Sequence, residues 1–283
     1  RVRPLAEPRL VAPSVAVGAG LGVLVPGPAG GGTLTTTVTN RGVAPLADVQ
    51  VSVRAPGGWT VTPTAATGRR RLATDATLST TWTVVAPEGT VAGSYPITIT
   101  AGYTWGPRHT AASTSSELVS LVVTAPADGR RHLGTLQPIS ATNALGPAEI
   151  DQSNGGSGPA DGALLTIGGR HYTRGIGTTA PSEIDYYLGG RCSLLVTDVG
   201  VDDEATAAVP ATFTVYADDT AAATSGPMST GDAPATLTAD LTGATLLRLV
   251  ATGSTTGSDG TTQADHADWA TPVLTCGAVD PTS

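Results

Sequence analysis

Short runs in which apolar and polar residues alternate fill the first part of the chain. They cover residues 34–39, 49–53, 59–61, 78–84, 95–99 and 118–123, and a glycine, proline or asparagine follows most of them. A period of two indicates a β-strand with one buried face, and a series of such runs separated by turns is typical of an immunoglobulin-like sandwich. Trp59 and Trp82 stand within these runs, where a tryptophan usually belongs to the core.

A second series of candidate strands follows, with a different character. It covers residues 164–167, 183–188, 194–199, 212–217, 235–241, 246–251 and 273–276. Long loops rich in glycine, serine and aspartate separate these runs, at residues 152–162, 218–233 and 253–264. Loops carried on a rigid β scaffold are the usual place for a binding site. The sequence therefore predicts an all-β protein with a second β-sandwich.

The chain has 283 residues, which is long for one β-sandwich and suitable for two, each with a core of its own. We expect a first domain over residues 1–124, in which 1–9 form a tail from an upstream region. A polar linker is expected over residues 125–131 and a second domain over 132–283. The chain begins with arginine and not methionine, which we interpret as a piece cut from a longer protein.

The composition argues against two classes of binding partner. The formal net charge of −8 argues against nucleic acid and anionic membranes, both of which need clustered basic residues. The one basic run, residues 69–71, lies among turn residues and is interpreted as a solvated loop. The apolar stretch at 15–25 is broken by glycines and is shorter than the roughly 20 residues that span a bilayer.

The two cysteines, Cys192 and Cys276, lie far apart and belong to no CxxC or Cys/His cluster. This usage fits a single disulfide in an oxidising compartment better than a zinc site, so we expect the two to be joined in a secreted protein.

Motifs of catalysis are missing from the sequence. There is no GxSxG nucleophile elbow and no HExxH metal motif, and small sandwiches lack the deep cleft that a pair of glycosidase carboxyls needs. We therefore expect this chain to be non-catalytic.

Two sets of motifs, each in a fixed order, resemble known families. The first domain resembles the NEW3 domain of bacterial α-galactosidases, through residues 38–40, 55–61, 82–87 and 92–96. The second resembles the NPCBM family of carbohydrate-binding modules, also called family 51. The matching pieces are residues 140–143, 146–151, 165–167, 174–177, 180–182, 200–204, 213–216, 247–249 and 265–270, with Cys192 and Cys276.

The second resemblance implies a jelly-roll sandwich, attached to a secreted bacterial glycoside hydrolase whose catalytic domain lies upstream. It also implies recognition of terminal galactose or related sugars. The site is expected on loops that carry Leu145, Glu149, Arg174, Thr179, Asp268 and Trp269. Leu145 stands where the family usually has tryptophan and Thr179 where it usually has histidine, so we expect binding weaker than is usual for the family. Trp269 is either an inward plug or an exposed stacking platform.

The acidic triplet Asp202, Asp203 and Glu204 follows a predicted strand. Two interpretations stay open. The carboxylates could hold a calcium ion, which takes oxygen ligands from loops, or one carboxylate could cap backbone amides in a turn. A rival for the whole chain also stays open: a structural or cell-surface β module that binds protein or polymer without monosaccharide specificity.

Overall fold

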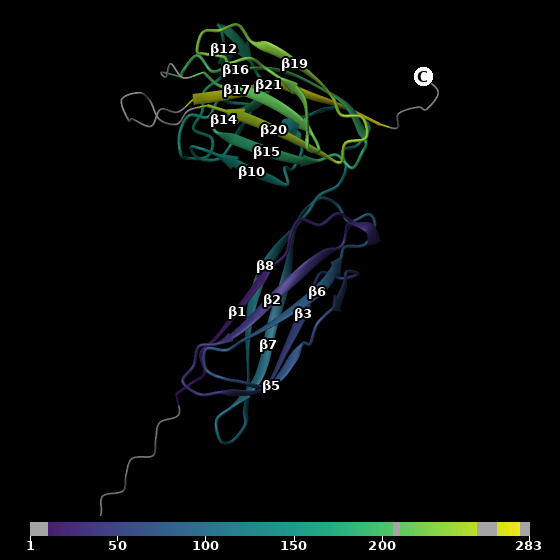
Figure 1. Ribbon diagram of the computed structural model, residues 1–283, viewed down its shortest axis with the longest axis vertical. Helices are drawn as coiled ribbons and strands as arrows, with labels where there is room; N and C mark the ends of the chain where they lie inside the picture. Colours follow the sequence, from purple (N-terminus) through teal and green to yellow (C-terminus); the bar gives the residue numbers. More distant parts are fainter. Residues whose placement is uncertain (1–10, 206–209, 254–264, 278–283) are drawn as a thin grey trace, which may run out of the picture. The chain divides into compact units, whose positions relative to one another are not determined.

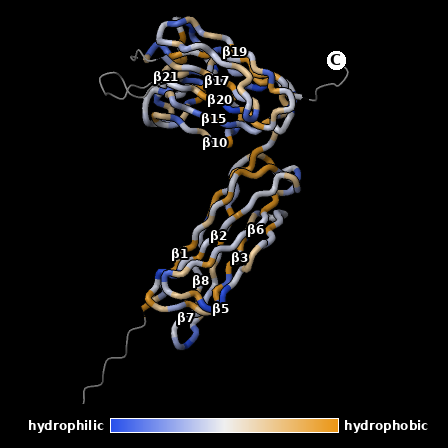
Figure 2. The backbone as a smooth tube through the Cα atoms, viewed as in Figure 1, coloured by the Kyte–Doolittle hydropathy of each residue, from blue (hydrophilic) through white to orange (hydrophobic). Residues whose placement is uncertain are grey.

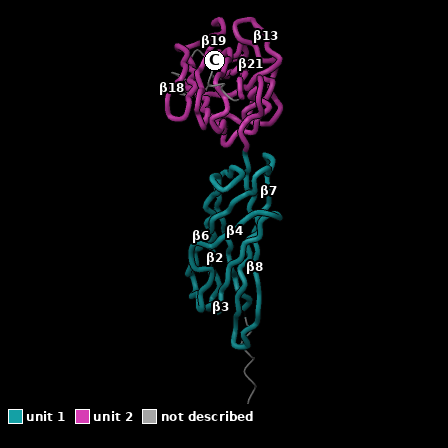
Figure 3. Tube along the Cα trace, turned by 90° about the vertical axis from the view of Figure 1, so that its right-hand side faces the viewer, with its two compact units in different colours: residues 1–123 teal, residues 124–283 magenta. Residues whose placement is uncertain are grey.

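The computed structural model describes residues 11–205, 210–253 and 265–277 and divides the chain into two compact units, residues 1–123 and 124–283 (Figures 1 and 3). Both units are all-β and built from packed antiparallel sheets, which confirms the predicted fold class. The described residues include only two short 3₁₀ turns as helical structure, Pro28–Gly30 and Leu133–Thr135, and no helix that could cross a membrane.

The first unit is a sandwich of two four-stranded sheets. One sheet has the order β1 (Val15–Gly20), β2 (Gly32–Asn40), β6 (Thr77–Val85), β4 (Thr60–Pro63). The other has the order β5 (Gly68–Leu72), β3 (Leu46–Arg54), β7 (Gly93–Trp105), β8 (Thr110–Val122).

Alternating side chains from both sheets form the core of this unit, and the same alternation is visible as hydropathy along the strands in Figure 2. Trp82 is buried in it, and its indole nitrogen donates a 3.0 Å hydrogen bond to the hydroxyl of Thr36. Trp59 is half-buried, and its ring centroid lies 5.4 Å from that of Tyr95. Both tryptophans therefore serve packing, as the alternating pattern predicts.

The basic run was predicted wrongly. Arg69, Arg70 and Arg71 are not in a loop but form most of the edge strand β5, which pairs with β3 alone. Their side chains are all exposed, so the strand shows no apolar alternation that a sequence pattern could detect.

The second unit packs a five-stranded sheet against a six-stranded one. The five-stranded sheet has the order β10 (Ser140–Asn143), β15 (Ser182–Tyr187), β20 (Leu246–Thr252), β17 (Thr212–Ala217), β18 (Thr220–Thr224). The other has the order β11 (Glu149–Ile150), β14 (Gly175–Ala180), β21 (Asp265–Cys276), β16 (Cys192–Val201), β19 (Ala235–Asp240), with β9 (Gly129–His132) also on β21. A separate hairpin joins β12 (Leu165–Ile167) to β13 (Arg170–Tyr172).

Several segments differ from the expectation. Part of the segment predicted as a linker, 125–131, belongs to β9, which pairs with the end of β21. The predicted loop 218–233 contains β18. Of the predicted loop 253–264, all but Gly253 lies outside the described residues. These strands are short or flanked by small polar residues, and pairing with a neighbour rather than local pattern makes them strands.

Cys192 and Cys276 form a disulfide, as predicted. They lie directly opposite each other at the ends of β16 and β21, in the middle of the six-stranded sheet. The bridge therefore fixes the register of the two longest strands of the second unit.

Candidate functional site

A network of amides organises one loop cluster of the second unit. The side chain of Asn143, at the end of β10, accepts a 2.6 Å hydrogen bond from the backbone amide of Thr179 and donates one of 2.7 Å to the carbonyl of Leu145. The hydroxyl of Thr179 donates to the side chain of Asn154, which in turn donates to the carbonyl of Pro147 at 2.8 Å. Asn143 and Asn154 thus bring Leu145 and Thr179, 34 positions apart in the sequence, into one cluster.

Leu145 and Thr179 differ in accessibility. Leu145 is half-buried, whereas Thr179 is 2% exposed and both its amide and its hydroxyl are used in the network. Thr179 therefore supports the cluster and offers no free polar atom to a ligand.

Glu149 also supports the cluster from inside. It is buried, and its two carboxylate oxygens accept 2.8 Å hydrogen bonds from the side chain of Gln152 and from the backbone amide of Ala160. A buried carboxylate with both oxygens engaged holds a loop in place, so Glu149 closes the 152–162 loop onto β11.

Arg174 is the one exposed cation among the predicted residues. Its guanidinium forms a 2.8 Å ion pair with Asp151, whose other oxygen accepts a 3.2 Å hydrogen bond from the amide of Gly175. Exposed pairs of this kind contribute little to stability, so the guanidinium can exchange its partner for a ligand.

Trp269 and Asp268 lie in strand β21 and do not belong to the loop cluster. Trp269 is 1% exposed, and its ring meets that of Phe213 edge-on at a centroid distance of 5.3 Å. Of the two interpretations of Trp269, the structure therefore shows the inward plug, and the indole ring is not accessible to a sugar. The adjacent Asp268 points to the opposite face of the sheet, as neighbours in a strand do.

The outer face above Asp268 is covered. Its strand neighbours are Gly177 and Gly200, and a side chain at either would meet Ser153 or Ile167 at less than 3 Å. The 151–164 loop and the β12–β13 hairpin thus lie directly on the sheet, and Asp268 between them is completely buried.

Neither carboxyl oxygen of Asp268 accepts a hydrogen bond from an N–H or hydroxyl group of the described residues. The carboxyl lies within hydrogen-bonding reach of the carboxyl of Asp202, which it can contact if one of the two is protonated. Burial raises the pKa of Asp268 well above the usual range of an aspartate, and Asp202, Glu204 and Asp203 act in the same direction, Asp202 most strongly. Desolvation and like charge both disfavour the ionised form, so a cation or a proton is needed to balance this cluster.

The acidic triplet fastens the β12–β13 hairpin. The carboxylate of Asp202 accepts hydrogen bonds from the amides of Thr166 at 2.8 Å and Glu204 at 2.9 Å. That of Asp203 accepts from the amides of Gly168 at 2.9 Å and Gly169 at 2.7 Å. These contacts are the backbone-capping arrangement weighed from the sequence, here made by two carboxylates rather than one.

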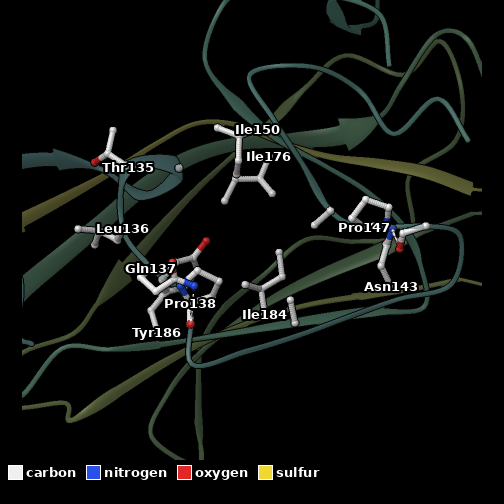
Figure 4. A pocket seen from close by; sticks show the side chains of 14 residues that line it. Thr135, Leu136, Gln137, Pro138, Asn143, Pro147, Ile150, Ile176, Ile184 and Tyr186 are labelled. Carbon is white, nitrogen blue, oxygen red and sulfur yellow. Dashed lines mark hydrogen bonds between the residues drawn. The ribbon is translucent and has the colours of Figure 1, made fainter. Parts of the chain in front are cut away.

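A hollow of the second unit lies between the edge strands β10 and β11 and has a volume of about 560 Å³. Figure 4 shows Ile150 and Ile176 on one side and Ile184 and Tyr186 on the other, with Asn143 and Pro147 at one end. A second, more open hollow of about 390 Å³ also borders Asn143 and includes Ser182 and Glu183. Asn143 therefore lines both hollows.

Sequence reasoning missed this apolar hollow. Its walls come from residues 134–150 and from β14 and β15, and no local pattern marks an isoleucine that faces a gap between two sheet edges. In strand β11 the pattern of burial is inverted, because the apolar Ile150 is 45% exposed and the acidic Glu149 beside it is buried. This inversion marks the position at which an apolar side chain faces the hollow.

These features define a β-sandwich binding module, with hollows and loops gathered beside Asn143. The NPCBM/NEW2 domain matches residues 114–275, and the NPCBM-associated NEW3 domain of alpha-galactosidase matches residues 29–104. The chain belongs to the NPCBM family, whose carbohydrate-binding modules are non-catalytic domains associated with glycoside hydrolases.

The chain is also similar to individual curated and solved proteins. A curated protein of Renibacterium salmoninarum named "Putative endo-alpha-N-acetylgalactosaminidase" is 30% identical over 251 residues, which are 87% of this chain; the chain spans 16% of that relative. The structure of CBM51 from Clostridium perfringens GH95 in complex with methyl-galactose is 29% identical with a TM-score of 0.43, over 52% of this chain and 99% of that one. CBM51-2 from Clostridium perfringens ZmpB, solved with GlcNAc and with its INT domains, is 23% identical with a TM-score of 0.43. The match covers 65% of this chain and 37% of that one.

Proposed function

We propose that this chain is the non-catalytic accessory region of a secreted bacterial glycoside hydrolase and that its second unit binds galactose-type sugars. The observation that carries the proposal is the Asn143 loop cluster of an NPCBM domain, which rims an apolar hollow. The first unit serves as a spacer, and binding raises the local concentration of the upstream catalytic domain on its glycan.

The hollow has the chemistry that a sugar needs. A pyranose presents C–H groups on one face and hydroxyls around its edge. Ile150, which is 45% exposed, offers apolar contact to the former, the buried Ile176 and Ile184 form the apolar wall behind it, and the exposed amide of Gln137 lines the same hollow. Tyr186 lines the hollow as well but is 2% exposed, so it belongs to the wall, and the polar contacts of a sugar fall to groups at the rim such as Gln137.

Galactose-type sugars are the class that we propose. The family resemblance implies terminal galactose, and the Renibacterium relative is named for a substrate that contains N-acetylgalactosamine. Both sugars share the axial 4-hydroxyl and the apolar patch next to it, so one site of this kind serves either.

Substitution Leu145→Trp should strengthen binding. Leu145 is half-buried and lies between Asn143 and Gly146, both of which line the hollow, so a tryptophan there adds a stacking surface at the rim. We expect the unaltered chain to bind methyl galactoside with a Kd near the millimolar range, and the variant to bind about fivefold more tightly, which corresponds to about 1 kcal/mol. Titration calorimetry on both proteins measures this.

The matched control is Leu246→Trp, because Leu246 is an exposed leucine at the opposite end of β20 from Ala251 and Thr252, which lie in the second hollow at Asn143. This control should leave affinity unchanged. Equal affinities of all three proteins would place the sugar site elsewhere. The double variant Leu145→Trp, Thr179→His restores both usual family residues and should bind more tightly than the unaltered chain, but because Thr179 is buried we expect no gain over Leu145→Trp alone. The single variant is the cleaner test because Thr179→His also removes the bond to Asn154.

The rival function is a β module that binds protein or polymer without monosaccharide specificity. Burial of Thr179 and Trp269 favours it, because neither side chain can contact a sugar. Absence of binding to any monosaccharide by both the unaltered chain and Leu145→Trp, together with retention on an insoluble glycan or a cell surface, would select this rival.

A calcium ion at the acidic triplet remains a prediction. The buried carboxyl of Asp268 close to Asp202 favours a cation, whereas the backbone bonds of Asp202 and Asp203 occupy their oxygens. Among the described residues, no three histidine, cysteine or acidic side chains are arranged to hold a metal ion.

Excess EDTA should lower the melting temperature of the second unit if calcium is bound, because an ion held only by the folded state adds stability by mass action. Readdition of calcium should restore it. An unchanged melting curve, with no metal in elemental analysis, would leave the triplet as a hydrogen-bonded turn alone.

A further inference from the structure

The edge strand β5 of the first unit carries three adjacent, exposed cations. Arg69, Arg70 and Arg71 are exposed, and no carboxylate of the described residues lies within 4 Å of their guanidinium groups. Charged side chains on an edge strand discourage pairing with other sheets, and this is sufficient reason for one or two of them. Protection of the edge does not require a run of three arginines that pair with no described carboxylate, in a chain whose net charge is −8. The run is therefore a candidate for ligand binding.

Two of the three arginines line a hollow. Arg70 and Arg71 share a hollow of about 450 Å³ with Trp105, Thr104 and His109, which we call the Trp105 cleft. Its floor follows from the register of the sheet: Ala47 of β3 pairs with Arg71 on one side and with Thr104 on the other, and its small side chain leaves a depression between them. Arg69 does not line the hollow.

The aromatic wall comes from the end of β7. Trp105 packs partly against the core and is half-buried, so part of its ring remains accessible. His109 lies in the turn after it, held by a 3.1 Å hydrogen bond from its backbone amide to the carbonyl of Gly106. Core packing on one side and a tight turn on the other therefore fix the aromatic wall of the hollow that Arg70 and Arg71 also line.

We propose that the Trp105 cleft binds an anionic sugar. The sugar ring packs on Trp105, and its carboxylate or sulfate pairs with Arg71, which shares a register position with Ala47 and Thr104, while Arg70 adds its positive charge at the border of the hollow. A guanidinium presents a planar fork of donors that matches either anion bidentately, and an indole packs well on the C–H face of a pyranose. This site is separate from the galactose-type site proposed above and does not depend on it.

Charge limits the class of ligand further. Asp48, an acidic neighbour in this region, accepts a 3.4 Å hydrogen bond from Thr104, and within the part of the chain that the structure describes no carboxylate pairs with Arg70 or Arg71. The negative charge of the whole chain opposes a long polyanion, because its charges act beyond the local contact. A single anionic group on a sugar fits these two conditions, whereas a neutral sugar leaves both arginines unused.

Calorimetry on the full chain at low salt tests the proposal with sugars that lack galactose. Methyl sialoside supplies a carboxylate, glucose 6-sulfate supplies a sulfate, and methyl glucoside is the neutral reference. We expect one or both charged sugars to bind and the neutral one not to bind. Which charged sugar binds more tightly identifies the anion.

Variants localise the binding. Arg70→Gln with Arg71→Gln should weaken the affinity for the charged sugar at least tenfold, while Arg69→Gln, which removes one charge from the same strand outside the hollow, should change it less than twofold. Methyl galactoside affinity and the melting temperature serve as controls and should stay constant in all variants. Equal losses in Arg69→Gln and in the double variant, or no preference for charged over neutral sugar, would overturn the proposal.

Discussion

Replacement of Trp269 by alanine is expected to lower the free energy of unfolding of the second unit by about 3–5 kcal/mol. Trp269 is one of the largest fully buried side chains in the protein and meets Phe213 edge-on at 5.3 Å. Its removal leaves a cavity between the two sheets that the surrounding strands cannot close. Chemical denaturation measures the loss, and Leu246→Ala, at a 37% exposed position, should cost less than about 1 kcal/mol.

A milder variant separates packing from ligand contact at this position. Trp269→Phe keeps an aromatic ring against Phe213, so we expect a smaller loss of stability and an unchanged affinity for methyl galactoside in the folded protein. A large loss of affinity at a nearly normal melting temperature would show instead that Trp269 contacts the sugar and that the sandwich opens at this strand.

Removal of the disulfide is the second change with a large expected effect. The bridge between Cys192 and Cys276 closes a loop of 84 residues, and the chain-entropy model assigns about 4 kcal/mol to a loop of this size. Cys192→Ser with Cys276→Ser should therefore destabilise the second unit by about that amount. The first unit contains no cysteine, so its own unfolding transition should stay unchanged.

Denaturation of the unaltered chain with and without a reducing agent provides a second measurement of the same difference. Two free thiols by intact mass in protein from its native host would contradict the bridge. Coincident unfolding curves of the oxidised and reduced chain would show that the paired strands β16 and β21 hold their register without it.

The strands that were foreseen are those with one buried face. β2 and β6 alternate between buried and accessible positions along most of their length, and a period of two in the sequence reports this directly. β14 was missed for the opposite reason. All six of its residues are buried because loops and the β12–β13 hairpin cover its outer face, so glycine and threonine fill a strand without alternation.

The sequence predicted the candidate site as a set of loop residues, and the structure brings only some of them together and places Thr179 in strand β14. Family motifs pointed to loops that carry Leu145 and Thr179, and the network around Asn143 joins them. The same motifs also included Glu149, Asp268 and Trp269, all of which are buried. A motif records that a residue is required at a position, and packing and ligand contact impose the same requirement.

The sequence by itself determined the two β-sandwiches, their order, the family and the single disulfide, because alternation, turn residues, motif order and the number of cysteines are all local or countable properties. Only the tertiary structure decided that Arg69, Arg70 and Arg71 form an edge strand, that Trp269 faces the core, and that an apolar hollow opens between β10 and β11. Each of these features depends on which strand lies beside which. Pairing between strands that are far apart in the sequence produces no local pattern from which it could be predicted.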